Sequence, residues 1–286
     1  MRGFPHLLSS IGFESLLGNT SWFSQSLVSN HHSALAFAQV SLEGRGARLN
    51  WLLSIDEGDK HLSALIENLS LESALRGACC LLSAARAEDD LFVILRNSGF
   101  CRYGWQRLWQ LHRERFPPHT TSAFSFSWSR SQASDQVEID SLRRHLTSSS
   151  VQTVRKITGE TLPEFVLRKD GNICGIASVS TYASKVIATP LIAQSDLPTH
   201  VLLPSLFARF FPTYQTAYLV QSSDQAWLED VLLDLGDPVF DREELLVKHF
   251  TSIQKASIHV LNHAGHNRHA DTITPMIKMH DSQDNL

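Results

Sequence analysis

The stretch LFVILRNSGFCRYGWQRLW, residues 91–109, decides the fold, because a helical pattern and a strand pattern meet in it at one sharp turn. The acidic residues at 88–90 precede an apolar run, and acids favour the positive end of a helix dipole. Gly99 stands where a glycine commonly ends a helix. Aromatic residues follow it, as in strands. The stretch therefore predicts a helix that ends at Gly99 and leads directly into a strand.

The elements before this stretch have a clear order. Residues 33–42 and 47–55 predict two strands, and the loop EGRG at 43–46 is typical of a hairpin. Residues 61–77 carry apolar side chains near the helical period. Residues 78–85 form a short apolar run, which predicts a central buried strand. The first half thus predicts strand, strand, helix, strand, helix, strand.

The second half repeats this order. A hairpin, a strand, a helix, a strand and a glycine-ended helix are predicted at 164–182, 184–194, 197–212, 216–223 and 225–236. The two halves keep a nearly constant separation at five anchor pairs: Ala38–Ala177, Leu81–Leu219, Gly99–Gly236, Leu108–Leu245 and His112–His249. A repeat of about half the chain predicts an internal duplication.

Composition shifts predict where the halves begin and end. The pair Pro117-Pro118 opens a Ser-rich stretch, which is a natural linker point. We therefore expect an N-terminal domain over 1–115 and a C-terminal domain over 116–255. Residues 256–286 are polar and aperiodic, and this composition predicts a disordered tail.

Charge and hydropathy exclude several classes of function. The net charge is -4 and the basic residues are scattered, so no footprint for nucleic acid is present. No apolar run approaches the roughly 18 residues of a membrane span. The N-terminal residues lack the pattern of a secretory signal, and the four cysteines form no disulfide framework. These features predict a soluble cytoplasmic protein with free thiols.

The histidine-rich tail and Cys174 predict neither a metal site nor a catalytic nucleophile. Four histidines are spaced at intervals that suit zinc, but glycine and asparagine interrupt the run and no cysteine or carboxylate pair completes a site: His259, His263, His266 and His269. We therefore expect a solvated tail and no metal. Cys174 lacks a nearby histidine partner, and no dinucleotide, phosphate-loop or nucleophile-elbow motif occurs.

The duplicated element order resembles the GNAT acyltransferase superfamily over residues 30–112 and 122–252. In that family the last helix usually ends in Gly-Phe, as in Ser98-Gly99-Phe100. The resemblance implies an α/β fold with a mixed sheet, built as two tandem GNAT-like domains. It also implies N-acyl transfer from acetyl-CoA, or another acyl-CoA, to an amine of a small molecule.

The resemblance further implies where the cosubstrate binds. In the family, acyl-CoA lies against the third long strand where the sheet splays, and backbone N–H groups there polarise the thioester carbonyl. The pyrophosphate lies at the N-terminus of the following helix. Carried onto the first half of this sequence, the resemblance implies that the backbone of Leu53, Ser54 and Ile55 holds the thioester. It also implies that residues 58–62 hold the pyrophosphate, with contacts from Gly58, Asp59 and Lys60.

The sequence departs from the family pattern in both halves. The first loop, DEGDKH at 56–61, has one glycine and three acids, and the second, QSDLPT at 194–199, has no glycine. A tyrosine often lies four residues before the terminal glycine and protonates the departing thiolate. Leu95 and Leu232 occupy this position here, and leucine cannot donate a proton.

The catalytic residues therefore stay unassigned. Another tyrosine could supply the proton, but no spacing selects among Tyr103, Tyr182, Tyr214 and Tyr218. If one half is active, the first is favoured, because it keeps Gly58 and the Ser-Gly-Phe ending. Two alternatives stay open: a catalytically degenerate binding or structural module, and a regulator that binds a small molecule between the halves.

Overall fold

The computed structural model describes residues 2–4, 21–28, 34–54, 59–117, 126–159, 163–194 and 199–250. These residues belong to one compact unit, Met1–Ser252. The tail from 256, with its four histidines, lies outside the described residues, as do Ile55 and Gly58.

The first half has the predicted element order. Its elements are β1 (Arg2–Phe4), β2 (Trp22–Val28), β3 (Ala34–Glu43), β4 (Gly46–Ser54), α2 (Asp59–Leu75), β5 (Cys80–Arg86), α3 (Asp90–Asn97), β6 (Cys101–Leu111) and a 3-10 turn at Arg113–Arg115. The predicted ending of α3 is confirmed. Gly99 has a φ of +87°, a left-handed conformation that glycine adopts without steric cost, and β6 begins two residues later.

The second half follows the same plan. Its elements are β7 (Phe126–Arg130), a 3-10 turn (Ala133–Asp135), α4 (Gln136–Leu146), α5 (Ser149–Thr158), β8 (Phe165–Lys169), β9 (Asn172–Tyr182), β10 (Lys185–Ile192), α6 (Thr199–Phe207), β11 (Thr216–Ser222), a 3-10 helix (Ser223–Leu228), α7 (Glu229–Leu235), β12 (Gly236–Pro238) and β13 (Glu243–His249). The helix predicted at 225–236 is thus divided between a 3-10 segment and α7, and α5 was not predicted.

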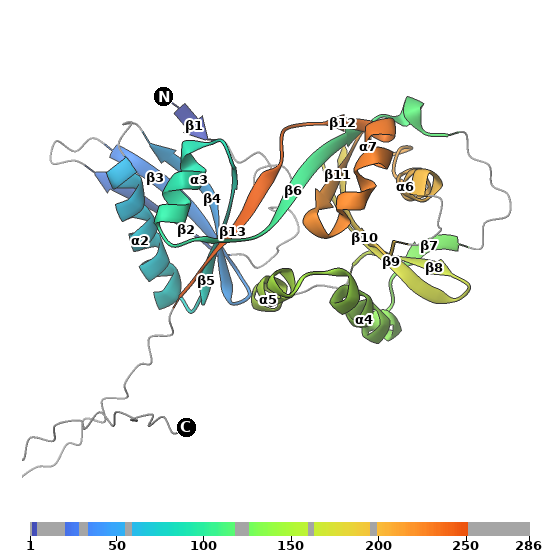
Figure 1. Cartoon of the computed structure of the whole chain (residues 1–286), viewed down its shortest axis with the longest axis horizontal. Helices are drawn as coiled ribbons and strands as arrows, with labels where there is room; N and C mark the ends of the chain where they lie inside the picture. The colour runs from blue at the N-terminus through green and yellow to red at the C-terminus, as the bar shows by residue number, and fades with distance from the viewer. Residues whose placement is uncertain are drawn as a thin grey trace, which may run out of the picture. The chain divides into compact units, whose positions relative to one another are not determined.

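The described strands form one mixed sheet that runs through both halves (Figure 1). Its order is β2-β3-β4-β5-β13-β6-β11-β10-β9-β8-β7, with β1 paired to β4 and β12 paired to β6. The α/β class and the mixed sheet predicted from the sequence are therefore confirmed. In each half, two parallel strands lie at the centre, β4 with β5 and β10 with β11.

The two halves exchange their last strands. β13, at the end of the second half, lies between β5 and the first part of β6, so it completes the first half. In return, the second part of β6 lies between β11 and β12 and completes the second half. Each half of the sequence therefore contributes a strand to the part of the sheet that the other half forms.

Helices cover the two faces of the first-half sheet. One face packs against α2 and α3, where Leu81 of β5 and Leu246 of β13 share a core with Leu65 and Leu95. On the opposite face Cys80, Leu82 and Val247 pack against α5, a helix of the second half. We call these the α2/α3 face and the α5 face.

Helix α5 is held against the hairpin between β3 and β4. The backbone N–H of Arg45 donates to the carbonyl of Ile157 at 2.8 Å. Gly44 has a φ of +57°, and a Cβ at this position would lie 2.6 Å from the carbonyl oxygen of Thr158. Glycine is therefore required here both by the backbone conformation and by the close approach of the helix.

In the described part of the chain, no helix is both long and apolar enough to cross a membrane.

Candidate functional site

The parallel strands β4 and β5 separate part of the way along their length. They pair at three positions, Gly46–Cys80, Ala47–Leu81 and Arg48–Leu82. Beyond Arg48, β4 continues to pair with β3 as far as Ser54, and β5 continues to pair with β13 as far as Arg86. We call this region, 49–54 on β4 and 83–86 on β5, the first-half fork. Ligands of open α/β sheets commonly bind outside the carboxyl ends of parallel strands.

A β-bulge lies in the first-half fork. Val40 pairs with Leu49 and Gln39 pairs with Trp51, so Asn50 is an extra residue on β4. Asn50 is buried, and its Oδ1 accepts a hydrogen bond from Ser41 Oγ at 3.5 Å. A bulge breaks the ladder and re-aims the side chains that follow, and bulges are common beside active sites.

The bulge decides which side chains of β4 face the helices. Leu49 and Leu52 both belong to the core beneath α2 and α3, although a regular strand would turn them to opposite faces. Trp51 and Leu53 are consequently turned toward the α5 face, where Leu53 stays 37% exposed. Its pairing partner on β3, Phe37, is similarly exposed. The fork therefore has an apolar surface on the α5 face.

A segment of the chain itself lies along the edge of β4 in the fork. β1 pairs antiparallel with β4, at Arg2–Ser54, Gly3–Leu53 and Phe4–Leu52. Because β3 occupies the other edge of β4, β1 lies on the edge that β4 turns toward β5. This edge thus accepts an extended chain of amide groups.

The predicted cosubstrate contacts that the structure describes lie at the end of β4 and at the start of α2. Leu53 and Ser54 are the last residues of β4, and both pair with β1, as Leu52 does. Asp59 and Lys60 begin α2, where the first N–H groups of a helix have no partner within it. Ile55 and Gly58 lie outside the described residues.

Neither leucine that replaces the family's tyrosine can reach solvent. Leu95 is fully buried with Leu91 and Phe100 beneath the first-half sheet. Leu232 is fully buried in the second-half core. These helix positions thus contribute to packing and cannot donate a proton.

Ser83 is the first residue of β5 inside the fork. Strand alternation places it with Leu81 and Ala85 on the α2/α3 face, and it is 3% exposed. Its Oγ has no hydrogen-bond partner within the described residues. A buried hydroxyl without a partner is unusual in proteins, and a bound ligand is one explanation for it.

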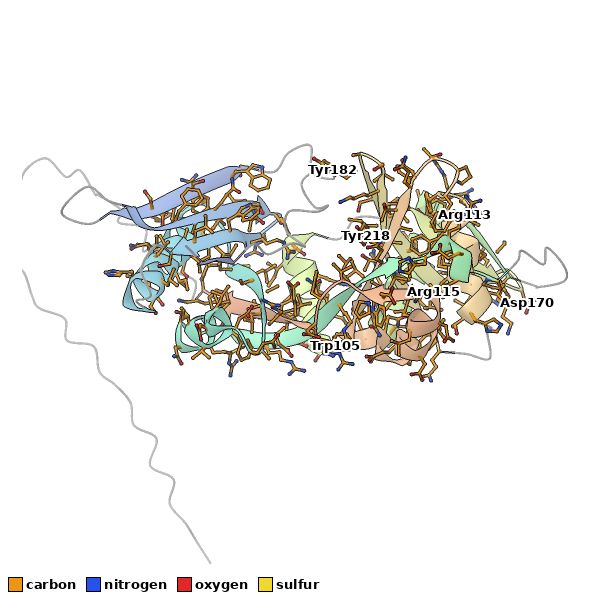
Figure 2. The ribbon with its side chains drawn as sticks, turned by 90° about the horizontal axis from the view of Figure 1, so that it is seen from above. Trp105, Arg113, Arg115, Asp170, Tyr182 and Tyr218 are labelled. Carbon is orange, nitrogen blue, oxygen red and sulfur yellow. The ribbon has the colours of Figure 1, made fainter. Side chains whose placement is uncertain are left out.

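The four tyrosines lie in different surroundings. Tyr182 is exposed at the end of β9, and Tyr218 lies on β11 with Lys185 Nζ 5.8 Å from its ring centroid, so both belong to the second half (Figure 2). Tyr214 packs against the second-half core. Tyr103 packs against α5 and Cys80 in the first half, where burial raises the pKa of its hydroxyl. Of the four tyrosines, only Tyr103 therefore lies in the first half.

Glu243 is a buried carboxylate at the edge of the first-half fork. It is 6% exposed, and its Oε2 accepts a hydrogen bond from Gln106 Nε2 at 3.2 Å. It pairs with Arg86, the last residue of β5. Burial raises the pKa of its carboxyl; the Gln106 bond and Arg86 lower this pKa, and Asp89 raises it. Sequence reasoning missed Glu243, because no local pattern indicates that β13 joins the first half.

The second half has a corresponding fork, which differs in its backbone. β10 and β11 pair from Lys185–Thr216 to Ala188–Leu219 and then separate. β10 keeps an unbroken register with β9 up to Ile192, so the bulge of the first half has no counterpart here. Pro190 lies within this part of β10 and has no N–H to offer a ligand.

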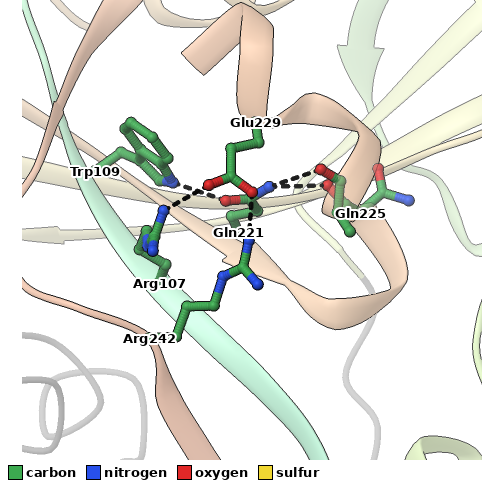
Figure 3. Close-up of polar contacts among 7 residues, drawn as sticks. Arg107, Trp109, Gln221, Gln225, Glu229 and Arg242 are labelled. Carbon is green, nitrogen blue, oxygen red and sulfur yellow. Dashed lines mark hydrogen bonds and ion pairs between the residues drawn. The ribbon is translucent and has the colours of Figure 1, made fainter. Parts of the chain in front are cut away.

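A glutamine side chain closes the second-half fork. Gln225 Oε1 accepts from the backbone N–H of Ile192 at 2.9 Å, and Gln225 Nε2 donates to the Ile192 carbonyl at 3.2 Å. Gln225 is held in turn by Gln221, whose Nε2 donates to the Gln225 carbonyl (Figure 3). Trp109 Nε1 donates to Gln221 Oε1 at 2.9 Å. All these residues are buried, so the closure is part of the second-half core.

Within the described residues, no group of three or more His, Cys, Asp and Glu side chains is arranged to hold a metal ion.

Comparisons with known proteins support the fold. No family model matches the sequence, and no curated protein sequence matches it. Among solved structures, a GCN5-related N-acetyltransferase from Sphaerobacter thermophilus is similar at a TM-score of 0.53 and 12% identity, over 79% of this chain and 80% of that one.

Two further structures have comparable similarity. A GCN5-related N-acetyltransferase from Kribbella flavida gives a TM-score of 0.52 and 10% identity, over 88% of this chain and 98% of that one. A functionally unknown conserved protein from Staphylococcus epidermidis gives 0.52 and 9%, over 85% and 99%. The chain therefore has the fold of GCN5-related N-acetyltransferases (GNAT), as the sequence resemblance predicted.

Proposed function

We propose that this protein is an N-acyltransferase that moves the acyl group of acetyl-CoA, or another acyl-CoA, to an amine of a small molecule, and that the first half carries the site. The observation that supports this most directly is the first-half fork, with its bulge at Asn50 and its pairing edge on β4. The arm of CoA contains amide groups, and it can pair with the edge that β1 occupies.

The arm would enter beside the start of α2. Its pyrophosphate would bind the free N–H groups there, near Gly58, Asp59 and Lys60. Its amides would lie along Leu53, Ser54 and Ile55. Its thioester would reach toward the bulge at Asn50, which is nearer the start of β4 than residues 53–55, where the resemblance places it. Backbone N–H groups beside the bulge would polarise the thioester carbonyl.

Transfer then needs one bond to form and one to break. The amine nitrogen attacks the carbonyl carbon, the C–S bond breaks, and the thiolate leaves. Because Leu95 cannot donate a proton, the hydroxyl of Ser83 is the group we assign to the sulfur, as a hydrogen-bond donor on the α2/α3 face. A donor aimed at developing charge in a dry site lowers the barrier.

The second half would act as a partner and not as a second site. Its fork is closed by Gln225, and its loop at 194–199 lacks glycine. We therefore expect one acyl-CoA per chain. The free thiols at Cys79, Cys80, Cys101 and Cys174 suit a reducing compartment, so we place the protein in the cytoplasm.

The alternative is a catalytically degenerate GNAT-fold module with a binding or structural role. The two buried leucines and the pairing of β1 in the fork favour it. The two functions differ in turnover, because only the enzyme releases free CoA when an amine is added to the acetyl-CoA complex.

Calorimetry with acetyl-CoA tests the proposal. We expect micromolar binding with one site per chain, and a raised melting temperature, since a ligand that binds the native state stabilises it. Absence of both heat and thermal shift at millimolar acetyl-CoA would contradict the proposal, and two sites per chain would contradict the assignment to the first half.

A pair of matched variants locates the site. Gly58→Glu adds a negative charge and a side chain where the pyrophosphate is expected, and it should abolish binding. Ser195→Glu adds the same charge in the corresponding loop of the second half, and it should leave binding unchanged. The reverse result would move the site to the second half.

A further inference from the structure

The strand exchange brings a second-half residue to the edge of the first-half fork. β13 lies directly beside β5, and Glu243, its first residue, pairs with Arg86 at the end of β5. The C-terminal end of β5 is also the part of the strand that has separated from β4. Glu243 thus lies one strand away from the fork, at the carboxyl end of the parallel strands.

The face on which Glu243 lies follows from the alternation of β13. Leu246 packs in the core beneath α2 and α3, whereas Val247 packs against α5. Residues two apart on a strand share a face, so Glu243 and Leu245 lie with Val247 on the α5 face. If the acyl-CoA arm enters beside α2, the α5 face is left for the acceptor amine. Trp51 and Leu53 present their apolar surface on this same face.

One oxygen of the carboxylate is held by a hydrogen bond from the neighbouring strand. Gln106 Nε2 donates to its Oε2, and Gln106 lies on β6, the strand on the other side of β13. The neighbouring residue Glu244 points to the opposite face and forms an ion pair with Arg102 at 2.7 Å. Two adjacent glutamates of β13 therefore lie on opposite faces: Glu243 is buried on the α5 face, and Glu244 is ion-paired on the α2/α3 face.

We infer that Glu243, delivered by the exchanged strand, accepts the proton that the substrate amine loses when it attacks the thioester. This inference rests on the proposed function. The amine N–H bond breaks as the C–N bond is completed, the proton passes to the Glu243 carboxylate, and the departing thiolate is released as free CoA once it takes a proton from solvent. The second half, closed by Gln225, then has a catalytic role, because it supplies the base for the first half.

The charged groups that act on Glu243 bear on its pH dependence. Arg86, on β5, favours the ionised carboxylate, and Asp89, before α3, opposes it. Burial acts in the same direction as Asp89, so the carboxylate ionises at a higher pH than an exposed glutamate does. A base with a raised pKa takes a proton more effectively near neutral pH.

The test compares three variants of the full chain in acetyl transfer to 2-phenylethylamine and to butylamine, followed by release of the CoA thiol. Glu243→Gln keeps the size of the side chain and its bond to Gln106, and it should lower kcat/KM by about 100-fold near pH 7. The acidic limb of its pH–rate profile should disappear, while its Kd for acetyl-CoA stays unchanged. Glu243→Asp should recover part of the rate, because it restores a carboxylate.

Glu244→Gln is the matched control, and its rate and pH profile should equal those of the wild type. If Glu243→Gln also has the wild-type rate and profile, Glu243 is not the proton acceptor, although the enzyme function stands. If the wild-type protein binds acetyl-CoA but acetylates neither amine, or binds no acetyl-CoA, the proposed function fails and this inference fails with it. The two failures are therefore distinguishable.

Discussion

Gln225 and Ile192 are joined by two hydrogen bonds that use both ends of the glutamine amide and both polar groups of the isoleucine backbone, at 2.9 and 3.2 Å. In effect, a side chain replaces the neighbouring strand on β10. The equivalent edge of β4 in the first half pairs with β1 instead. A pairing strand of three residues can be displaced by a ligand that offers the same backbone hydrogen bonds, whereas a buried side chain within the core cannot leave without loss of stability. The two halves therefore differ at the position where the parallel strands of each half separate.

The closure predicts a large effect of Gln225→Ala on stability. The substitution leaves the N–H and carbonyl of Ile192 buried without partners, and this should reduce the free energy of unfolding by about 2–4 kcal/mol. Urea denaturation measures it. Gln215→Ala, at an exposed position, is the control and should change stability by less than about 0.5 kcal/mol. Equal effects of the two substitutions would show that the closure does not stabilise the second half.

The pairing of β1 predicts competition with acetyl-CoA. Gly3→Pro removes an N–H and disfavours the ladder with Leu53, so β1 should leave the edge of β4 more often. Because the competent state is then more populated, the apparent Kd measured by calorimetry should fall several-fold.

The control for this experiment is Gly3→Ala, which keeps the N–H and should bind as the wild type does. An unchanged or weaker affinity of Gly3→Pro would mean that β1 and the cosubstrate do not share the edge.

Ser83→Ala should separate catalysis from stability. If Ser83 donates to the departing thiolate, its loss should lower kcat by about 10-fold, the equivalent of roughly 1.4 kcal/mol. Stability should be unchanged or slightly higher, since the hydroxyl has no partner among the described residues and alanine has nearly the same shape.

Ser73→Ala provides the comparison for Ser83→Ala. Ser73 is another buried serine whose hydroxyl lacks a partner in the described part of the chain, but it lies on α2, away from the fork. It should show the same stability and a normal kcat. A normal kcat in both variants would remove Ser83 from the mechanism.

Asp135 predicts a loss of stability in acid. It accepts a hydrogen bond from the Gln132 N–H at 3.0 Å and pairs with Arg168 at 2.7 Å, and both interactions lower the pKa of its carboxyl, the former more. A carboxyl with a lowered pKa stabilises the fold above its unfolded pKa of about 3.9 and loses this contribution as the pH falls through its folded value. Asp135→Asn should thus be less stable than the wild type at pH 7, and the difference should shrink toward pH 2.

Urea midpoints at several pH values measure this dependence. Asp170→Asn is the control for the loss of a carboxylate: Asp170 is an exposed turn residue with a φ of 52°, a conformation that asparagine tolerates, so its stability at pH 7 should be within about 0.5 kcal/mol of the wild type. A difference for Asp135→Asn that stays constant from pH 7 to pH 2 would contradict the argument.

Much of the fold could be predicted from the sequence. The helix that ends at Gly99, the hairpin at 43–46 and the order of elements in both halves follow from the periodicity of apolar residues and from glycines that allow turns, and these are local properties. The absence of a proton donor at positions 95 and 232 also follows, because it depends on residue identity alone.

The site could be predicted only in part. The resemblance led to Leu53 and Ser54, which lie at the end of β4, but it gave no indication of the bulge at Asn50. A bulge depends on how one strand registers against its partner, and composition does not report register. Ser83 was missed for a related reason, since the polar residue in an apolar run becomes notable only when its burial is known.

The sequence by itself determined which elements form, that they form twice, and which side chains are missing from the expected chemistry. The repeat relates Leu108 to Leu245, but it cannot say which half each strand joins, because both strands fit either place by their local pattern. Only the tertiary structure decided that they exchange, that Gln225 meets Ile192 across 33 residues and that Gln106 meets Glu243 across 137. Such contacts depend on the packing of the whole sheet, because the free energy gained when two strands are buried side by side is not a property of either strand alone.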